Sequence, residues 1–264
     1  MPELPDAETL AAARLALSID GPVATITLNA PERRNSMVPS MWHALADIGA
    51  ALDDDIRVVV LRGAGACFSA GLDTGLINGT GVPGEEAILD LMRAPEQEVI
   101  DTIDGYQRGF TWLHDPRFIT IASIHGFAIG GGFQLALACD LRMVAENAWF
   151  CMKEPALGLV PDLTGTKPLV DLVGYARALE ICATARQVSA PEAAQLGLAT
   201  AVVPAAELDE ATSDLVQALL ANDAGAVRET TALLASARVE DLESQRLLER
   251  TAQVRRFRAL VAGG

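Results

Sequence analysis

Aromatic residues are scarce in this chain, at 5% of its 264 residues, although half of the residues are hydrophobic. A core must therefore be built from Ala, Leu, Val and Ile side chains packed at close range, which is a globular composition. A chain of this length can bury one large core and also lies within the range of single α/β domains. We predict one main domain with a helical appendage.

Basic residues are also in short supply, with 20 Lys and Arg against 35 Asp and Glu, so the net charge is −15. This charge repels polyanions at long range and favours solubility, which argues against a nucleic acid partner. A small anionic ligand can still bind, because a few local cations and helix N-termini override the distant field.

The sequence has no apolar run long enough to cross a bilayer, and its acidic first 13 residues lack a basic segment before an apolar stretch. These absences predict a protein that neither spans a membrane nor carries a visible export signal. The four cysteines show no C-x-x-C pairing, which fits free thiols in a reduced cytoplasm. We therefore expect a cytoplasmic protein.

The predicted elements of the first half follow an α/β order. Residues 14–28 contain two short strand-like runs joined at Asp20-Gly21, a dipeptide that tolerates the positive φ of a tight hairpin. Apolar residues at helical spacing predict a helix over residues 39–52. The β-branched run at residues 56–61 is typical of a strand buried on both faces.

The later elements become increasingly helical. Residues 85–113 have helical periodicity, and residues 119–124 form another strand-like run. A glycine cluster at residues 130–132 leads into a short helix and a further strand. The rest is mostly helical, with one strand candidate at residues 198–203 and final helices over residues 223–260.

Two glycine-containing turns carry the chemical interest of the sequence. FSAGLD at residues 68–73 and GGGFQLA at residues 130–136 both put a strand end beside a turn and then a helix. Glycine lets a substrate carbonyl approach the backbone without meeting a Cβ, and a helix N-terminus adds partial positive charge. Two amides aimed at one oxygen would form an oxyanion hole, which stabilises the negative charge that develops on a thioester oxygen.

Other kinds of site fit the sequence less well. A glycine cluster is also what a tight turn requires, so that alternative stays open for GGG. No G-x-G-x-x-G follows a strand near the N-terminus, and Ser69 lacks the G-x-S-x-G setting of a serine hydrolase. The three histidines are scattered without metal-ligand spacing, so we predict no metal site.

Four segments together resemble successive blocks of the crotonase (enoyl-CoA hydratase/isomerase) superfamily: ITLNAPERRNSM, VVVLRGAGACFSAGLD, IHGFAIGGGFQLALACDLRMVAENAWF and KEPALGLVPD. The resemblance implies an α/β fold, a crotonase-like spiral of β-β-α units with a C-terminal helical region that helps to build trimers, often paired into hexamers. We therefore expect a flexible N-terminus over residues 1–13, a spiral core over residues 14–203 and a helical trimerisation region over residues 204–264.

The resemblance also assigns residues to the oxyanion hole. Its amides fall between Gly and Asp in AGxD and at the middle glycine of GGG, which here are Leu72 and Gly131. The neighbouring residues expected to bind substrate are Ala70, Gly71, Asp73 and Gly130. Arg33, beside a predicted turn, is expected to meet the phosphates of coenzyme A, although a solvated surface charge is the alternative.

Hydratases of this family use two glutamates, and this sequence keeps only one of them. The first position holds Gln134, whose amide cannot exchange a proton near neutral pH but could orient a water or substrate by hydrogen bonding. The second position holds Glu154, in MKEPALG. Activation of water by two carboxylates is therefore in question.

Asp162 is a further candidate proton carrier. In the dienoyl-CoA isomerase branch that the sequence most resembles, a carboxylate at the matching position works with the matching glutamate, and the long segment at residues 73–129 also resembles that branch. Two carboxylates in a partly apolar pocket suit this chemistry, because burial and mutual repulsion raise one pKa toward the working pH. The alternative is that Asp162 caps the following helix.

The sequence thus predicts an acyl-CoA enzyme that shifts a proton on an enoyl- or dienoyl-CoA, as in fatty acid β-oxidation. Glu154 and Asp162 would carry the proton, and Leu72 and Gly131 would hold the oxyanion. Coenzyme A would enter as part of the substrate, with no separate cofactor. The alternatives are an enoyl-CoA hydratase with altered catalytic residues and a non-catalytic acyl-CoA-binding protein.

Overall fold

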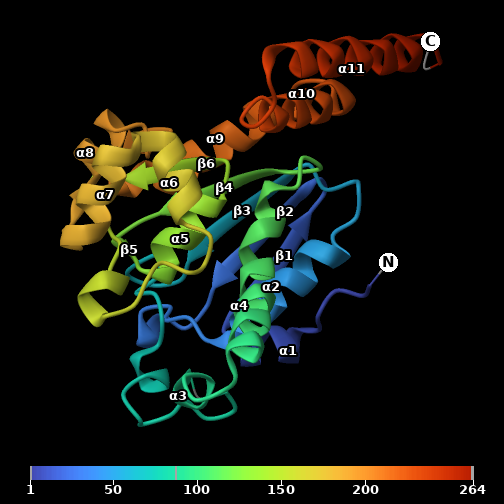
Figure 1. The fold of residues 1–264 in the computed structure, drawn as a ribbon. Helices are drawn as coiled ribbons and strands as arrows, with labels where there is room; N and C mark the ends of the chain where they lie inside the picture. The colour runs from blue at the N-terminus through green and yellow to red at the C-terminus, as the bar shows by residue number, and fades with distance from the viewer. Residues whose placement is uncertain (1, 87, 263–264) are drawn as a thin grey trace.

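A six-stranded sheet forms the centre of the computed structural model, which describes residues 2–86 and 88–262 (Figure 1). Its strands are, in spatial order, β1 (Leu15–Asp20), β2 (Val23–Leu28), β3 (Val58–Gly63), β4 (Ile119–Ile124), β6 (Leu141–Ala145) and β9 (Ala201–Val203). Only β1 and β2 pair antiparallel, and the other neighbours are parallel. The apolar runs of β3 and β4 are buried, as expected for parallel strands covered on both faces.

A second, smaller sheet has the order β5-β7-β8. Its strands are β5 (Phe127–Ile129), β7 (Trp149–Cys151) and β8 (Val188–Ser189). β7 and β8 are not predicted from the sequence, because strands of two or three residues are too short to show an alternating pattern. The hairpin predicted at residues 14–28 is confirmed, with Gly21 at φ 50° in its turn.

Helices surround both sheets. The α-helices are α1 (Ala7–Ala12), α2 (Pro39–Ala51), α3 (Ile88–Leu91), α4 (Glu96–Thr111), α5 (Gly131–Ala138), α6 (Thr166–Val173), α7 (Tyr175–Thr184), α8 (Ala190–Gln195), α9 (Leu208–Leu220), α10 (Ala224–Ser236) and α11 (Leu242–Ala262). The short 3-10 helices are η1 (Pro31–Arg33), η2 (Thr74–Leu76), η3 (Trp112–His114), η4 (Glu154–Leu157) and η5 (Ala205–Glu207).

The N-terminal segment differs from the flexible stretch predicted over residues 1–13. Residues 7–12 form α1, which Asp6 caps by accepting a hydrogen bond from the amide of Thr9 at 2.8 Å. Leu10 and Ala13 are buried in the core beside β1 and α2. An N-cap and buried apolar residues hold this segment, although it is acidic overall.

The helix predicted over residues 85–113 is divided into α3, α4 and η3. Pro95 is the N-cap of α4 and has extended backbone angles, φ −55° and ψ 145°. Proline has no N–H to donate the hydrogen bond that a continuous helix would need there. It also disfavours helical backbone angles in the residue before it. The helical periodicity thus corresponds to helices in the structure, but Pro95 separates α3 from α4.

We predict that Gly109→Ala destabilises the packing of α4 against α2. A Cβ on Gly109 would lie 2.3 Å from the Trp42 carbonyl oxygen, so the helices would have to move apart. Overpacking of this kind costs about 1–3 kcal/mol. One turn earlier, a Cβ on Gly105 would meet only His43 Cε1, at an ordinary 3.6 Å.

The matched control is therefore Gly105→Ala, which should stabilise the same helix by about 0.5–1 kcal/mol because alanine is the better helix former. Chemical denaturation of both variants measures the two effects. Equal stabilities would contradict the close approach of α4 to Trp42.

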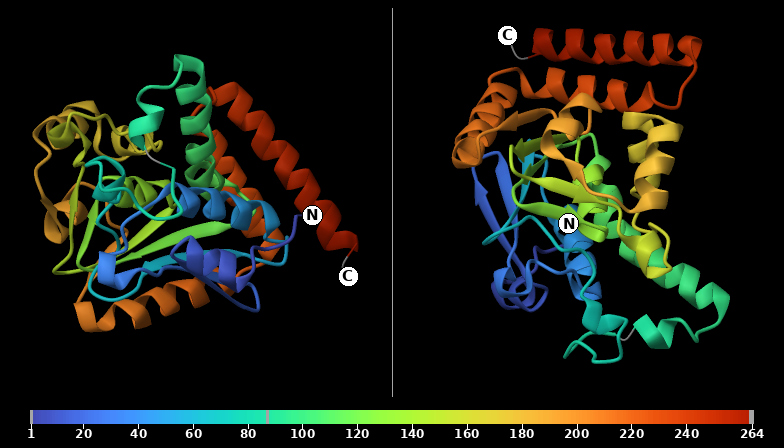
Figure 2. Two further views of the ribbon diagram at one scale, coloured as in Figure 1. Left: turned by 90° about the horizontal axis from the view of Figure 1, so that it is seen from below. Right: turned by 90° about the vertical axis from the view of Figure 1, so that its left-hand side faces the viewer.

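The C-terminal helices divide into two groups. α9 packs against β3, β4 and β6, so the first helix of the predicted region at residues 204–264 belongs to the core. α10 and α11 instead form a pair that lies at one end of the molecule (Figures 1 and 2). α10 has no buried residue, and α11 buries only Ala252.

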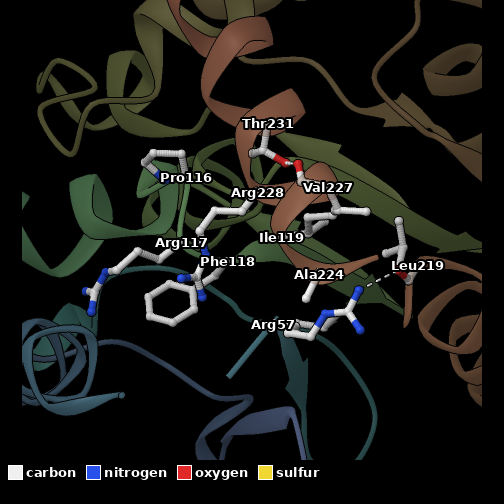
Figure 3. Close-up of a pocket in the computed structure, with 11 residues that line it drawn as sticks. Arg57, Pro116, Arg117, Phe118, Ile119, Leu219, Ala224, Val227, Arg228 and Thr231 are labelled. Carbon is white, nitrogen blue, oxygen red and sulfur yellow. Dashed lines mark hydrogen bonds between the residues drawn. The ribbon is translucent and has the colours of Figure 1, made fainter. Parts of the chain in front are cut away.

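A cavity of about 20 Å³ between β4 and α10 is surrounded by arginines that are already hydrogen-bonded (Figure 3). Arg57 donates to the carbonyls of Leu219 and Leu220 at 3.3 and 3.0 Å, near the end of α9. Arg228, from α10, donates to the carbonyl of Asp54 at 2.7 Å. Because these donors satisfy main-chain carbonyls, this region attaches the C-terminal helices to the sheet.

Candidate active site

The two glycine turns that the sequence analysis singled out lie side by side. Ser69 and Ala128 form a parallel bridge, and the amide of Ile129 donates to the carbonyl of Ser69 at 3.0 Å. A Cβ on Gly71 would lie 2.4 Å from the Ile129 carbonyl oxygen and 3.3 Å from the Gly131 nitrogen. Only a glycine at position 71, here at φ 78°, allows this approach.

The amide of Leu72 is free of backbone pairing. Leu72 forms a parallel bridge with Met37, but the bonds run from Met37 N to Gly71 O at 2.8 Å and from Asp73 N to Met37 O at 2.9 Å. The N–H of Leu72 therefore faces away from Met37. Within the described part of the chain it donates to no acceptor.

The amide of Gly131 also has no acceptor within residues 2–86 and 88–262. Gly131 is the first residue of α5, and the first amides of a helix have no partner within it and carry partial positive charge. Its N-cap, Gly130, has φ 52° and ψ −122°, angles that favour glycine, and its own amide donates to the carbonyl of Cys151 at 2.8 Å. The turn thus leaves the Gly131 N–H at the helix end, in a buried position, without an acceptor among the described residues.

Glu154 places its carboxylate against this turn. It is the first residue of η4 and is buried, and a Cβ on Gly130 would lie 3.2 Å from its Oε1 and 3.7 Å from its Oε2. Oε1 accepts a hydrogen bond from Gln134 Nε2 at 2.6 Å, whereas Oε2 is buried without a partner among the described residues. Burial raises the pKa of Glu154, the charge of Asp162 raises it further, and the bond from Gln134 opposes both.

Asp162 does not cap a helix, which corrects that alternative from the sequence analysis. α6 begins at Thr166, and its N-cap is Gly165, three residues after Asp162. Within residues 2–86 and 88–262 no other residue donates a hydrogen bond to the Asp162 carboxylate, while the Asp162 carbonyl accepts from Gln107 Nε2 of α4 at 2.7 Å. Burial raises the pKa of Asp162.

Gln134 is completely buried, and its carboxamide is engaged within the protein. Its Oε1 accepts from the amides of Leu163 and Gly165 at 2.9 and 3.1 Å, and its Nε2 donates to Glu154. The expected contact of Gln134 with substrate stays a prediction. The observed contacts link the helix of the glycine turn to the segment that carries Asp162.

The remaining predicted binding residues lie around the first glycine turn. The Asp73 carboxylate accepts hydrogen bonds from Arg14 Nη1 at 2.8 Å and from Ser36 Oγ at 3.0 Å. These bonds attach the first glycine turn to the neighbouring segments. Arg33 lies 3.5 Å from Asp73 and its side chain is 51% exposed, and the amide of Ala70 donates to a main-chain carbonyl. Their contacts with substrate stay predictions.

No metal centre is found in the described ranges, where no three His, Cys, Asp or Glu side chains are grouped as ligands. None of the helices that the structure describes is long and apolar enough to cross a membrane. A cavity of about 460 Å³ lies at the ends of β3 and β4 and includes Arg62, His125 and Asp209 in its lining. None of the predicted catalytic residues lines it.

The turn at residues 163–165 is not predicted from the sequence. Thr164 has φ 68°, a left-handed conformation that β-branched residues rarely adopt, and this conformation directs two amides at Gln134. Gln107 was missed as well, because a single glutamine in a helix gives no signal of what it contacts. The paired bonds of Gln134 are visible only in three dimensions.

Comparison with known proteins identifies the family. The model of the enoyl-CoA hydratase/isomerase family matches residues 18–260. The peroxisomal Δ(3,5)-Δ(2,4)-dienoyl-CoA isomerase of Arabidopsis thaliana is 33% identical over 85% of this chain and 81% of its own, and a short-chain-enoyl-CoA hydratase of Clostridium acetobutylicum is 30% identical over 80% and 77%.

The solved structures agree with this assignment. A Thermobifida fusca YX protein in complex with CoA, provisionally named an enoyl-CoA hydratase, is 50% identical, with a TM-score of 0.93 over 99% of this chain and 100% of its own. The mixed α/β fold of this chain, with its C-terminal helices, matches that structure and bears out the crotonase-like fold predicted from the sequence. This chain therefore belongs to the enoyl-CoA hydratase/isomerase family, in the crotonase superfamily.

Proposed function

We propose that this protein is an isomerase of unsaturated acyl-CoA thioesters. The observation that carries the proposal is the position of Glu154, whose Oε2 is buried beside Gly130. Neither this oxygen nor the adjacent amide of Gly131 has a hydrogen-bond partner among the described residues. A base adjacent to an oxyanion-binding amide is the arrangement needed to remove a proton next to a thioester.

The amides of Leu72 and Gly131 would hold the thioester oxygen. As Glu154 takes a proton from the carbon next to the carbonyl, negative charge moves onto that oxygen, where two N–H donors and the N-terminus of α5 stabilise it. Return of the proton to a different carbon moves the double bond. The raised pKa of Glu154 suits a group that must both accept and donate a proton.

Gln134 favours an isomerase over a hydratase. Hydration of a double bond requires water to be deprotonated while a second proton is delivered, and a carboxamide can do neither near neutral pH. Gln134 also uses its carbonyl oxygen and one amide hydrogen within the protein. Because relatives include both hydratases and isomerases, a direct assay must decide between them.

The deciding experiment offers the purified protein 2-enoyl, 3-enoyl and 3,5-dienoyl-CoA and follows each product by chromatography. Movement of a double bond without uptake of water supports the proposal. Formation of a 3-hydroxyacyl-CoA from the 2-enoyl substrate would favour the hydratase alternative. Binding of all three thioesters without turnover would favour a non-catalytic acyl-CoA-binding protein.

Asp162→Asn is predicted to reduce dienoyl isomerisation by about 100-fold, the lower range for loss of a proton carrier, while 3-enoyl isomerisation continues through Glu154. Only the longer proton path needs a second carboxylate. Asparagine keeps the shape of the side chain, and the carbonyl that Gln107 holds is unchanged. Measuring both substrates on one folded variant tests this, and equal retention of both rates would contradict a role for Asp162 as proton carrier.

A homotrimer, alone or paired into a hexamer, is the assembly that we propose. Large apolar side chains of α10 and α11 are exposed, including Leu234, Phe257 and Leu260 at 67%, 59% and 66%. Exposed apolar surface on two helices that project from the body is typical of an interface between subunits (Figure 2). Sedimentation equilibrium should give a mass three or six times that of one chain, whereas a monomer at all concentrations would exclude this assembly.

A further inference from the structure

Gln134 holds together two segments that carry the proposed proton carriers. Its Oε1 accepts from Leu163 N and Gly165 N, and its Nε2 donates to Oε1 of Glu154. The side chain comes from the first turn of α5, so a single residue joins the oxyanion helix, Glu154 and the turn after Asp162. Its complete burial excludes water from these bonds, which strengthens each of them.

The turn at residues 163–165 is shaped to receive an oxygen atom. The positive φ of Thr164 lets the amides on either side of it converge, forming the concave arrangement of N–H groups called a nest. Gly165 provides the room, since a Cβ there would lie 2.6 Å from Gln134 Cγ. A left-handed β-branched residue is strained, so this turn requires support from its surroundings.

The bond to Glu154 makes its two oxygens unequal. Oε1 accepts a hydrogen bond from Gln134 Nε2 at 2.6 Å, and Oε2 has no partner in the part of the chain that the structure describes. When one oxygen of a carboxylate is held by a hydrogen bond, the other oxygen points in a fixed direction. The side chain then samples fewer orientations that are unsuited to proton transfer. Burial alone affects both oxygens of Glu154 and would not make one of them more available to substrate than the other.

We propose that Gln134 is a positioning residue that fixes Glu154 so that Oε2 exchanges the proton with substrate, and that it sets the turn after Asp162 through the same carboxamide. This inference rests on the proposed isomerase function. Glutamine suits the role because it presents an acceptor to the turn and a donor to Glu154 at once. A glutamate would satisfy the turn but would face Oε1 of Glu154 with a second acceptor.

The first test follows the ionisation of Glu154 by NMR of protein carrying carboxyl-¹³C glutamate, with the Glu154 signal assigned by its loss in Glu154→Gln. Gln134→Met removes both polar contacts, whereas Gln134→Glu keeps the acceptor for the turn and removes the donor. Both variants should protonate Glu154 at higher pH than the wild type, because a hydrogen bond to the carboxylate has been lost.

The matched control is Gln107→Met. Gln107 also binds this segment, through the Asp162 carbonyl, but it does not contact Glu154. Its loss should leave the Glu154 titration where it is in the wild type. If Gln134→Met fails to fold, Gln134→Glu still tests the donor, since the two turn amides keep an acceptor.

The second test measures isomerase kinetics on the substrate that the wild type accepts. Displacement of Glu154 should lower kcat in Gln134→Met by about 10- to 100-fold with little change in KM, and the acidic limb of the kcat profile should move to higher pH. A purely structural role would lower thermal stability without moving that limb.

The two hypotheses fail in different ways. An unchanged Glu154 titration in a folded Gln134 variant, or an unchanged kcat, would overturn the positioning role. A wild type inactive on all three thioesters would contradict the proposed function, while the NMR titration would still report whether Gln134 holds Glu154.

Discussion

Replacement of Glu154 with glutamine is expected to lower turnover by about 100- to 10,000-fold and to leave acyl-CoA affinity nearly unchanged. The substitution keeps the size of the side chain, and its amide oxygen can still accept from Gln134 Nε2. It removes the ability to carry a proton. The loss should therefore fall on kcat, with KM and the dissociation constant of the thioester little altered.

Steady-state kinetics and calorimetric titration of the substrate measure the two quantities on the same preparation. The control is Glu146→Gln, the same substitution at an exposed glutamate eight residues earlier, which should leave both unchanged. A folded Glu154→Gln enzyme with wild-type turnover would remove Glu154 from the mechanism.

The pH dependence of the wild type follows from the environment of Glu154. Burial first, and then the nearby charge of Asp162, raise the pKa of this carboxyl. A base must be deprotonated to act, so a raised pKa keeps the enzyme protonated and inactive to higher pH than an ordinary glutamate would. The rate should therefore rise with pH through this pKa, and that limb should be absent from the residual activity of Glu154→Gln.

The elements predicted most accurately are those specified by neighbouring residues. The β1–β2 hairpin depends on a turn dipeptide, and β4 is a mostly apolar run whose bounds were predicted as they are observed. The glycine turns at residues 68–73 and 130–136 were located because glycine itself is the signal. That they lie side by side came from the family resemblance, since it depends on how strands distant in sequence pair.

The parts that the sequence did not predict depend on contacts across the fold. The sequence predicts that Gln134 contacts substrate, yet the observed partners of its side chain lie 20 to 31 residues away along the chain. Asp162 fits the preferences of an N-cap, but α6 begins later, at Thr166. Propensity describes what a residue favours on its own, whereas these two positions are determined by their surroundings.

The boundary of the helical region shows the same limit. The family resemblance placed all the helices of residues 204–264 in one trimerisation region. In the structure, α9 buries Leu208 and Val216 against the sheet, while α10 and α11 project from it (Figure 1). Buried and exposed amphipathic helices have similar patterns, and the difference lies in what covers their apolar faces.

Gly131→Pro is the second substitution expected to have a large effect, with a loss of about 100- to 1000-fold in kcat, the usual result of removing one oxyanion donor. Proline has no N–H to donate. It should be tolerated by the backbone, because Gly131 is the first residue of α5, where proline fits a helix well. Gly130, the residue before it, already has non-helical angles, as a residue preceding proline requires.

The matched control is Gly131→Ala, which also adds a Cβ but keeps the N–H. That Cβ would lie 3.3 Å from Leu163 Cδ1 and from Met37 Sδ, a tight contact that both variants share. The difference between the two variants therefore reports the loss of the amide hydrogen together with the ring carbon that proline puts in its place, with the effect of the Cβ removed. We expect a modest loss of kcat in the alanine variant and the full loss of about 100- to 1000-fold in the proline variant.

Infrared spectroscopy of a bound thioester labelled at its carbonyl provides a readout independent of turnover. Hydrogen bonds from two amides polarise the carbonyl and lower its stretching frequency, so removal of one donor should return the frequency toward its value in solution. Gly131→Ala should keep the lowered frequency. If the proline and alanine variants have the same frequency and the same kcat, the Gly131 amide does not hold the oxyanion, because the only polar group that distinguishes them is that N–H.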